Sequence, residues 1–184
     1  MSRILMMIYG LVCYALGVVS LVLFILFANN HIGMIWPEYA ALGIDHANTA
    51  PWAMPMVVNI ALIVLFGLQH TIMARPAFKS RLTAFLPHAM ERSTYILMTA
   101  LVLIILVLYW QPMTGMVWHV ENETARLALQ GIYFLGWVIT FAATYMINHF
   151  HLFGLQQTFH WGNPDSTVKK FVTPMFYKLV RHPI

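Results

Sequence analysis

Four long stretches without Asp, Glu, Lys or Arg constrain the fold of this chain more than any other feature. They cover residues 4–28, 55–73, 94–110 and 127–147. An α-helix needs about 20 apolar residues to cross the hydrocarbon core of a bilayer. In lipid, only a helix satisfies all backbone polar groups within one such segment. The sequence therefore predicts an all-α fold, a polytopic membrane helix bundle with four transmembrane helices in this chain.

Composition supports a lipid-facing surface rather than a large soluble core. Hydrophobic residues make up 60% of the 184-residue chain and charged residues only 9%, whereas soluble domains carry about 25% charged residues. The basic residues are too few and too segregated for nucleic-acid binding, so no nucleic-acid partner is expected. The lone cysteine, Cys13, excludes an intrachain disulfide and a Cys-rich metal site, and it is expected to pack as a small buried hydrophobe.

The charges between the apolar stretches predict an orientation. Loop 29–54 is acidic, and loop 111–126 is acidic except for Arg126 at its end. Loop 74–93 and the tail 148–184 are mainly basic. Basic residues mark the cytoplasmic side of membrane proteins. We therefore expect a multi-pass protein of the bacterial inner (cytoplasmic) membrane with both termini in the cytoplasm.

This pattern divides the chain into two regions. Residues 1–147 form the predicted four-helix transmembrane region, with Gly10 and Gly17 on one face of the first helix for close helix packing. Residues 148–184 form a cytoplasmic-side interfacial segment. This segment mixes aromatic and polar residues, so it should lie on the membrane surface or fold back onto the helices.

Polar side chains at membrane depth are the first candidates for function. They are Asn59, Gln69 and His70 in the second stretch, and Asn148, His149 and His151 after the fourth. Interhelical hydrogen bonding is the simpler explanation for any one of them. Haem or metal binding is another alternative, because the chain has nine histidines and imidazole suits iron, copper and zinc. The histidines lack an i, i+4 pair, so we predict no metal site.

The tail segment 173–184, TPMFYKLVRHPI, combines aromatic, cationic and imidazole side chains. An aromatic face attracts a sulfonium or ammonium centre, and an arginine clamps a carboxylate through two hydrogen bonds. S-adenosylmethionine carries both a sulfonium and a carboxylate. The alternative is a basic-aromatic patch that anchors the tail to anionic lipid. On composition alone, the anchor is the simpler of the two explanations.

Several motifs of this chain resemble a known group of membrane enzymes. The tripeptide Arg181-His182-Pro183 resembles the RHPxY signature of the isoprenylcysteine methyltransferase-like membrane methyltransferases. The segments 69–79 (QHTIMARPAFK), 91–95 (ERSTY) and 148–157 (NHFHLFGLQQ) resemble the methanethiol S-methyltransferase branch of this group, which overlaps the NnrU-like family. The resemblance extends from about residue 60 to the end of the chain.

The resemblance implies an S-adenosylmethionine-dependent methyltransferase that methylates a small thiol, converting methanethiol to dimethyl sulfide. The implied cofactor-binding residues are Tyr177, Arg181, His182 and Pro183. A thiolate is a far stronger nucleophile than a thiol, so a general base is useful, and histidine suits neutral pH. The candidates are His149, His151 and His182, in no order that the sequence decides. A non-catalytic or regulatory NnrU-like membrane protein is the alternative.

Members of this branch continue past RHPI with Tyr, Gly and further membrane helices. This chain stops at Ile184. The resemblance therefore predicts a chain truncated before further C-terminal helices, with residues 148–184 starting an incomplete cofactor-binding region. On this expectation, the 184-residue chain alone binds S-adenosylmethionine poorly. The oligomeric state is not predicted.

Overall fold

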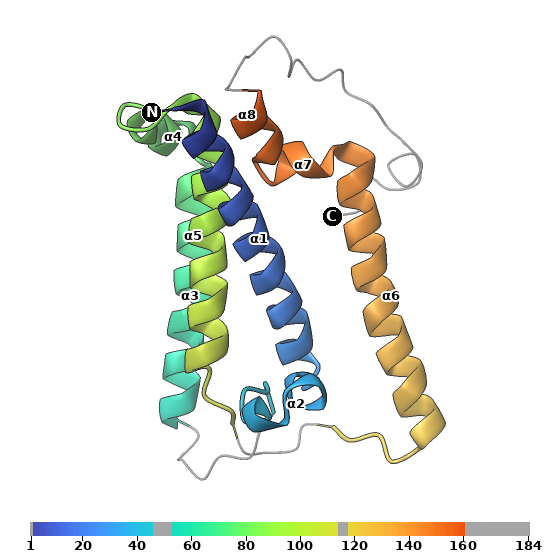
Figure 1. The fold of residues 1–184 in the computed structure, drawn as a ribbon. Coiled ribbons are helices and arrows are strands. Elements are labelled where there is room, and N and C mark those ends of the chain that lie inside the picture. The colour runs from blue at the N-terminus through green and yellow to red at the C-terminus, as the bar shows by residue number, and fades with distance from the viewer. Residues whose placement is uncertain (1, 46–52, 114–117, 161–184) are drawn as a thin grey trace. The chain divides into compact units, whose positions relative to one another are not determined.

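The computed structural model describes residues 2–45, 53–113 and 118–160, and every regular element in these ranges is helical (Figure 1). The elements are α1 (Arg3–Ala28), α2 (Ile32–Ile35), the 3₁₀ helix η1 (Pro37–Tyr39), α3 (Ala53–Ala74), α4 (Pro76–Leu82), α5 (His88–Tyr109), α6 (Glu123–Ile147), α7 (His149–Leu152) and α8 (Leu155–Phe159). The described part of the chain contains no strand, which confirms the predicted all-α class.

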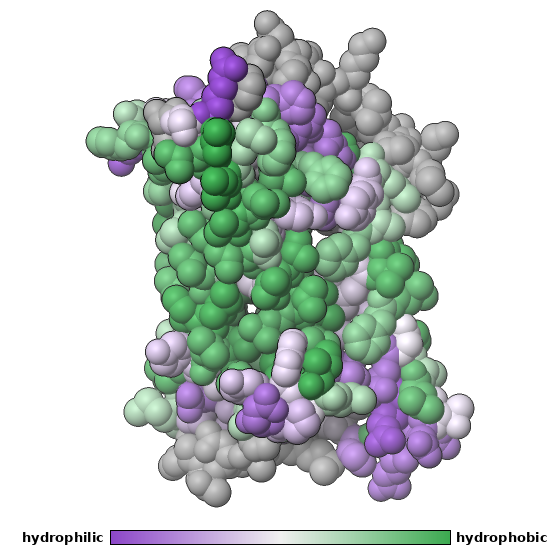
Figure 2. All heavy atoms as spheres, viewed as in Figure 1, coloured by the Kyte–Doolittle hydropathy of each residue, from purple (hydrophilic) through white to green (hydrophobic). Residues whose placement is uncertain are grey.

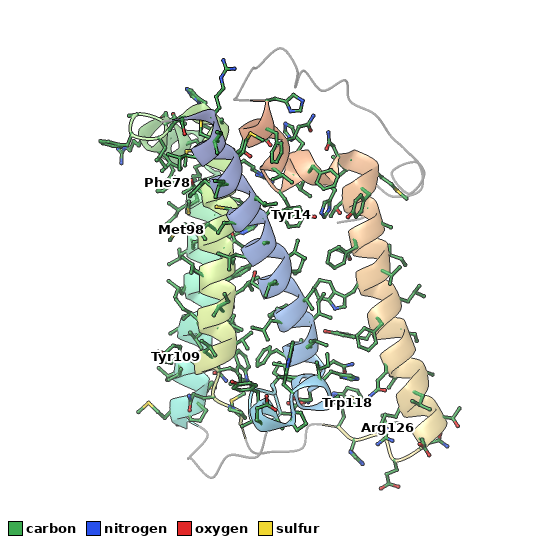
Figure 3. All side chains as sticks on the ribbon, in the orientation of Figure 1. Tyr14, Phe78, Met98, Tyr109, Trp118 and Arg126 are labelled. Carbon is green, nitrogen blue, oxygen red and sulfur yellow. The ribbon has the colours of Figure 1, made fainter. Side chains whose placement is uncertain are left out.

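Four helices, α1, α3, α5 and α6, are long and apolar enough to cross a membrane. They coincide with the four predicted stretches, so the chain is an integral, multi-pass membrane protein. Tyr109 at the end of α5 and Trp118 before α6, both labelled in Figure 3, are exposed. Aromatic side chains at helix ends are typical of the membrane interface.

Each of the four helices begins before the apolar stretch that predicted it, and the difference is largest for α5 and α6. α5 begins at His88 rather than at residue 94 and includes Glu91 in its first turn. An acidic side chain there stabilises the helix through its attraction to the positive end of the helix dipole. α6 begins at Glu123 rather than at residue 127, because the Asn122 side chain caps it by accepting a hydrogen bond from the Ala125 backbone N–H at 2.9 Å. Apolar runs mark the lipid-buried part of a helix, whereas capping marks its true start.

The chain forms two compact units. Unit 1 comprises residues 1–115 and 153–162, and unit 2 comprises residues 116–152 and 163–184. The described elements of unit 1 are α1, α2, η1, α3, α4, α5 and α8, and those of unit 2 are α6 and α7.

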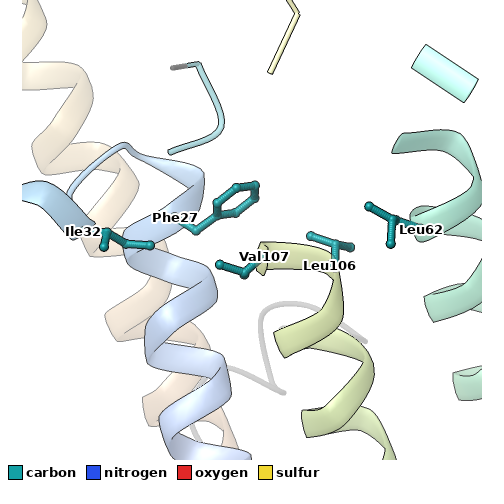
Figure 4. Packing of buried hydrophobic residues seen from close by; sticks show 5 residues of the cluster. All are labelled: Phe27, Ile32, Leu62, Leu106 and Val107. Carbon is teal, nitrogen blue, oxygen red and sulfur yellow. The ribbon is translucent and has the colours of Figure 1, made fainter. Parts of the chain in front are cut away.

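In unit 1, α1 and α3 both pack against α5. A buried apolar cluster near the C-terminal end of α1 consists of Phe27, Ile32, Leu62, Leu106 and Val107 (Figure 4). The Phe27 ring also meets the Trp110 ring edge-on, with centroids 5.8 Å apart. Hydrophobic side chains cover the middle of the helices of unit 1 on the face shown in Figure 2, and hydrophilic ones gather at their ends.

Glycines set the close contacts of α1, as their seven-residue spacing predicted. A Cβ atom added at Gly10 would lie 2.0 Å from Thr158 Oγ1, and one added at Gly17 would lie 2.5 Å from Ile96 Cγ2. Cys13, between the two glycines, is fully buried and free, as expected. In lipid, helices associate through such close packing rather than through a hydrophobic driving force.

Unit 2 is dominated by α6, whose side chains are largely exposed. Its buried residues are Ala143 and Thr144, close to its C-terminal end. On the rest of α6, the Ile132 and Val138 side chains are more than half exposed. Such an apolar surface suits contact with lipid.

Candidate functional site

One end of unit 1 gathers basic side chains. The N-terminus of α1, helix α4, the start of α5 and helix α8 all lie at this end, and α2 lies at the opposite end (Figure 1). The basic residues there are Arg3, Arg75, Lys79, Arg81 and Arg92. The described residues of the opposite end carry Glu38 and Asp45 but no lysine or arginine. We call this first end the basic end.

A polar cluster joins α3 to α5 at the basic end. The Tyr95 hydroxyl lies 2.7 Å from His70 Nε2, and the Arg92 guanidinium carbon lies 5.1 Å from the centre of the Tyr95 ring. The Phe66 ring stacks on the His70 ring, with centroids 5.4 Å apart. His70 therefore makes an interhelical hydrogen bond, which is the simpler of the explanations that the sequence left open.

Asn59 and Gln69 of α3 also make hydrogen bonds, to the segment that follows α5 and to α5 itself. The Asn59 side chain donates to the Gln111 carbonyl at 2.7 Å and accepts from the Gln111 N–H at 2.9 Å. Gln69 Nε2 donates to Thr99 Oγ1 at 3.4 Å. These side chains stabilise the α3–α5 pair by satisfying polar groups within unit 1.

Sequence reasoning missed Arg92 and Tyr95 as members of this cluster. Both lie in the segment ERSTY, and a spacing of three residues places them on one helix face. The signal was therefore present, but residue 92 was assigned to a loop because the apolar stretch begins only at residue 94. The ion pair between Lys79 Nζ and Glu91 Oε1, 3.2 Å apart, ties α4 to the same turn of α5.

The sequence predicted that residues 148–184 lie on the membrane surface or fold back onto the helices. Residues 153–160, which carry α8, fold back onto α1 and α5. The Ser93 hydroxyl donates to the Gly154 carbonyl at 3.1 Å, and the Tyr14 and Phe153 rings meet edge-on at 5.8 Å. Gly154 has φ +84°, and an added Cβ would lie 2.6 Å from the Ser93 nitrogen. Only glycine combines this left-handed conformation with so close a backbone approach.

In unit 2, a histidine is fixed where α6 ends. His149 follows Asn148, whose φ of 142° breaks the helix. His149 is 3% exposed, and its Nδ1 lies 2.8 Å from Thr144 Oγ1. The Tyr145 ring stacks on the imidazole, with centroids 4.2 Å apart and planes 3° from parallel. Burial lowers the pKa of His149 below its ordinary value, which favours the neutral ring.

Of the other predicted site residues, His151 is described by one hydrogen bond, and the rest lie outside the described residues. The His151 backbone N–H donates to the Asn148 side-chain oxygen at 3.1 Å, in the same short segment as His149. Tyr177, Arg181, His182 and Pro183 lie outside the described residues. In residues 2–45, 53–113 and 118–160, no group of three or more His, Cys, Asp or Glu side chains converges as a metal ion would need.

The fold and these polar clusters define a polytopic helical membrane protein with a charged, aromatic end. The chain is 38% identical over 184 residues to methanethiol S-methyltransferase 2 of Bradyrhizobium diazoefficiens, covering 100% of this chain and 68% of that protein. It is 37% identical over 185 residues to methanethiol S-methyltransferase of Mycobacterium tuberculosis, covering 100% of this chain and 73% of that protein. The chain belongs to the methanethiol S-methyltransferase family.

A more distant likeness extends to animal proteins. Nurim of Xenopus laevis is 31% identical over 137 residues, which cover 69% of this chain and 47% of Nurim. No family model matches the chain, and no solved structure matches it.

Proposed function

We propose that this protein is an S-adenosylmethionine-dependent S-methyltransferase that converts methanethiol to dimethyl sulfide. The observation that carries the proposal is the similarity over the whole chain to proteins named methanethiol S-methyltransferase, at 38% and 37% identity. A third such protein, from Crocosphaera subtropica, is 34% identical over 185 residues and also matches 100% of this chain.

The described residues fit a carboxylate-bearing cofactor at the basic end. α8 packs there on α1 and α5, and arginine side chains of α4 and α5 make this end favourable for an anionic group. Residues expected to hold the cofactor follow α8 in the chain, with Tyr177 facing a sulfonium and Arg181 binding a carboxylate. When bound, S-adenosylmethionine supplies an electrophilic methyl group on its sulfonium sulfur.

The contribution of the chain is then to position the thiol and to accept its proton. His149 suits this role because burial lowers its pKa and so favours the neutral ring, and because Thr144 and Tyr145 contact the ring. A positioned general base contributes about 10²- to 10⁴-fold to a reaction rate. Methanethiol is small and apolar, so it can reach the protein through the lipid that surrounds the exposed faces of the helices.

We further propose that the basic end faces the cytoplasm of a bacterial cell. Lysine and arginine in short loops are retained on that side, and S-adenosylmethionine is a soluble cofactor that would arrive there. Single cysteines introduced by Ala84→Cys near the basic end and Ala41→Cys near the opposite end test this. Cys13 is fully buried and gives little background. In intact spheroplasts, a membrane-impermeant maleimide should label only the Ala41→Cys variant; labelling of Ala84→Cys alone would reverse the orientation.

The activity is tested by dimethyl sulfide in the headspace over membranes supplied with methanethiol and S-adenosylmethionine, measured by gas chromatography. Arg181→Ala should weaken cofactor affinity by about 10-fold or more, since a charged hydrogen bond contributes about 1.5–3 kcal/mol. Arg126→Ala is the matched control, because Arg126 is exposed at the start of α6. Absence of dimethyl sulfide with the unaltered full-length gene product would refute the proposed function. Equal affinities in the two variants would refute the role of Arg181.

A further inference from the structure

The chain passes from α3 to α5 through residues 75–86, which we call the turn segment. α3 ends at Ala74, and the extended backbone of Arg75 interrupts the helix before α4 begins at Pro76. Backbone hydrogen bonds continue helical turns beyond α4 as far as Leu86. Because α3 and α5 are both long and apolar enough to cross a membrane, the turn segment lies at the membrane surface.

Two arginines of the turn segment have no side-chain partner in the described parts of the chain. Arg75 and Arg81 are exposed, and neither side chain makes an ion pair or a hydrogen bond with residues 2–45, 53–113 or 118–160. Lys79, by contrast, is paired with Glu91, with Nζ and Oε1 3.2 Å apart. Glu91 is the one carboxylate described at the basic end, so the positive charges of Arg75 and Arg81 are uncompensated there.

The turn segment also presents an uncovered aromatic ring. Phe85 is 88% exposed, more than any other large hydrophobic side chain described. Phe78, Leu82 and Leu86, which recur every four residues, are instead partly buried. This spacing is typical of the face that a surface helix turns toward its own protein. Phe85 lies outside that face, and a phenyl ring left in water forgoes the hydrophobic free energy of burial.

Anionic phospholipid supplies what both kinds of side chain need. Its headgroup phosphates lie just outside the hydrocarbon core, and an arginine binds a phosphate group through two parallel hydrogen bonds. Its acyl chains give the Phe85 ring an apolar surrounding, as in helices that lie at the membrane interface with basic and aromatic side chains. A soluble phosphate compound would fit Arg75 and Arg81 but would leave Phe85 in water. Charge, aromatic exposure and position therefore all favour a lipid ligand.

We propose that the turn segment is a binding surface for anionic phospholipid. Arg75 and Arg81 bind the headgroup phosphates, and the Phe85 ring lies among the acyl chains close to the headgroups. Lys79 remains paired with Glu91 and ties α4 to α5. The whole surface belongs to unit 1, and it depends neither on methyl transfer nor on which side of the membrane the basic end faces.

The first test measures lipid affinity. The full chain, purified in a non-ionic detergent, is titrated with phosphatidylglycerol, which is anionic, or with phosphatidylcholine, which is zwitterionic. Native mass spectrometry gives the dissociation constant of the first bound lipid. The variants are Arg75→Gln, Arg81→Gln, their combination, and Phe85→Ala. Lys79→Gln is the matched control, because it removes one positive charge from the same segment but from a side chain that is already paired.

We expect the unaltered chain to bind phosphatidylglycerol more tightly than phosphatidylcholine. Arg75→Gln and Arg81→Gln should each weaken phosphatidylglycerol binding about 5-fold, and together about 30-fold, which is the effect typical of basic residues near an anionic lipid surface. Lys79→Gln should change it by less than about 2-fold, because its charge is already engaged by Glu91. Phe85→Ala should weaken the binding of both lipids about 10-fold, since the ring contacts acyl chains that the two lipids share.

A second measurement needs no variant. The unaltered chain is reconstituted in vesicles of equal parts phosphatidylglycerol and phosphatidylcholine, in which one of the two lipids carries a photoactivatable diazirine on its acyl chain near the glycerol. Peptide mass spectrometry then locates the labelled residues. Phosphatidylglycerol should label the peptide that contains Phe85 more than phosphatidylcholine does. An unlabelled Phe85 peptide would overturn the proposal even if the variants do not fold.

Three further results would overturn the proposal, and none of them bears on dimethyl sulfide formation. One is a combined Arg75→Gln and Arg81→Gln variant that binds phosphatidylglycerol as tightly as the unaltered chain. Another is displacement of phosphatidylglycerol by an equal concentration of glycerol phosphate, which would show that the arginines bind a soluble phosphate instead. The third is a dimer that Phe85→Ala abolishes, because it would place a second copy of the chain on this ring.

Discussion

α5 and α6 are similar in length and apolar character, yet they differ in how they are buried. α5 has buried residues along its whole length, from Ala89 to Val107, where α1 and α3 pack on it. α6 has buried residues only at Ala143 and Thr144. Glycines show the same contrast, because an added Cβ at Gly10 would strike Thr158 whereas one at Gly131 would meet nothing within 4 Å.

The difference shows that apolar length marks a membrane-crossing helix but not the surface by which it packs. Lipid tails are as apolar as leucine, so helices in a bilayer associate through close packing and polar contacts. Unit 1 has these along α1, α3 and α5, whereas unit 2 concentrates them around Thr144 and His149. Stability should therefore be most sensitive to substitution in unit 1, and activity in the last turn of α6.

The largest expected effect is the loss of a buried ring in unit 1. Phe27→Ala should lower the free energy of unfolding by about 3–5 kcal/mol, because it leaves a cavity where Phe27 is only 1% exposed. Ile132→Ala in α6, where the side chain is 66% exposed, should change it little. SDS titration of the protein in mixed micelles, followed by tryptophan fluorescence, measures both. Equal losses would contradict the contrast between the units.

The next effect compares two asparagines. Asn59→Ala should cost about 2–4 kcal/mol, because Asn59 is 3% exposed and its loss leaves two polar backbone groups of Gln111 without their partner. Asn122→Ala removes the cap of α6 and should cost about 1 kcal/mol. The same titration gives both values. A larger loss for Asn122→Ala would show that capping outweighs interhelical bonding here.

A glycine substitution should have opposite signs in the two units. Gly154→Ala should cost about 2 kcal/mol, because an alanine resists the left-handed conformation and its Cβ would strike the Ser93 nitrogen. Gly131→Ala lies inside α6 with open space around it and should stabilise by about 0.5–1 kcal/mol. Thermal midpoints from circular dichroism at 222 nm compare them. Destabilisation by Gly131→Ala would mean that α6 packs closely at this position.

The sequence predicted those features that depend on the hydrophobicity of a long stretch or on the spacing of residues along a helix. The four apolar stretches located α1, α3, α5 and α6, and the spacing of Gly10 and Gly17 predicted close packing on one face of α1. These predictions depend on many residues acting together, so a single misjudged position does not change them. The start of α5 was predicted too late, at residue 94 rather than at His88, because charged residues such as Arg92 lie in its first turns and interrupt the apolar stretch.

The candidate site was predicted less completely because it depends on single backbone turns. His149 was among the three candidate bases, but its pairing with Thr144 requires the break at Asn148. The local sequence did not predict that the backbone of Asn148 would adopt a positive φ angle. Likewise, the contact of Gly154 with Ser93 joins residues 61 positions apart, and one sequence alone does not reveal such a pair.

The smallest predicted effect concerns the hydrogen bond that fastens the α8 segment to α5. Ser93→Ala should cost about 1 kcal/mol, because it removes the buried bond from the Ser93 hydroxyl to the Gly154 carbonyl. Thr140→Val in α6 should cost almost nothing, since Thr140 donates to a carbonyl of its own helix. Both are measured by SDS titration, and protection of the 153–160 backbone from hydrogen exchange is measured beside it. Loss of protection in Ser93→Ala but not in Thr140→Val is expected. Unchanged protection in both would show that Gly10 and Gly154 hold α8 through packing alone.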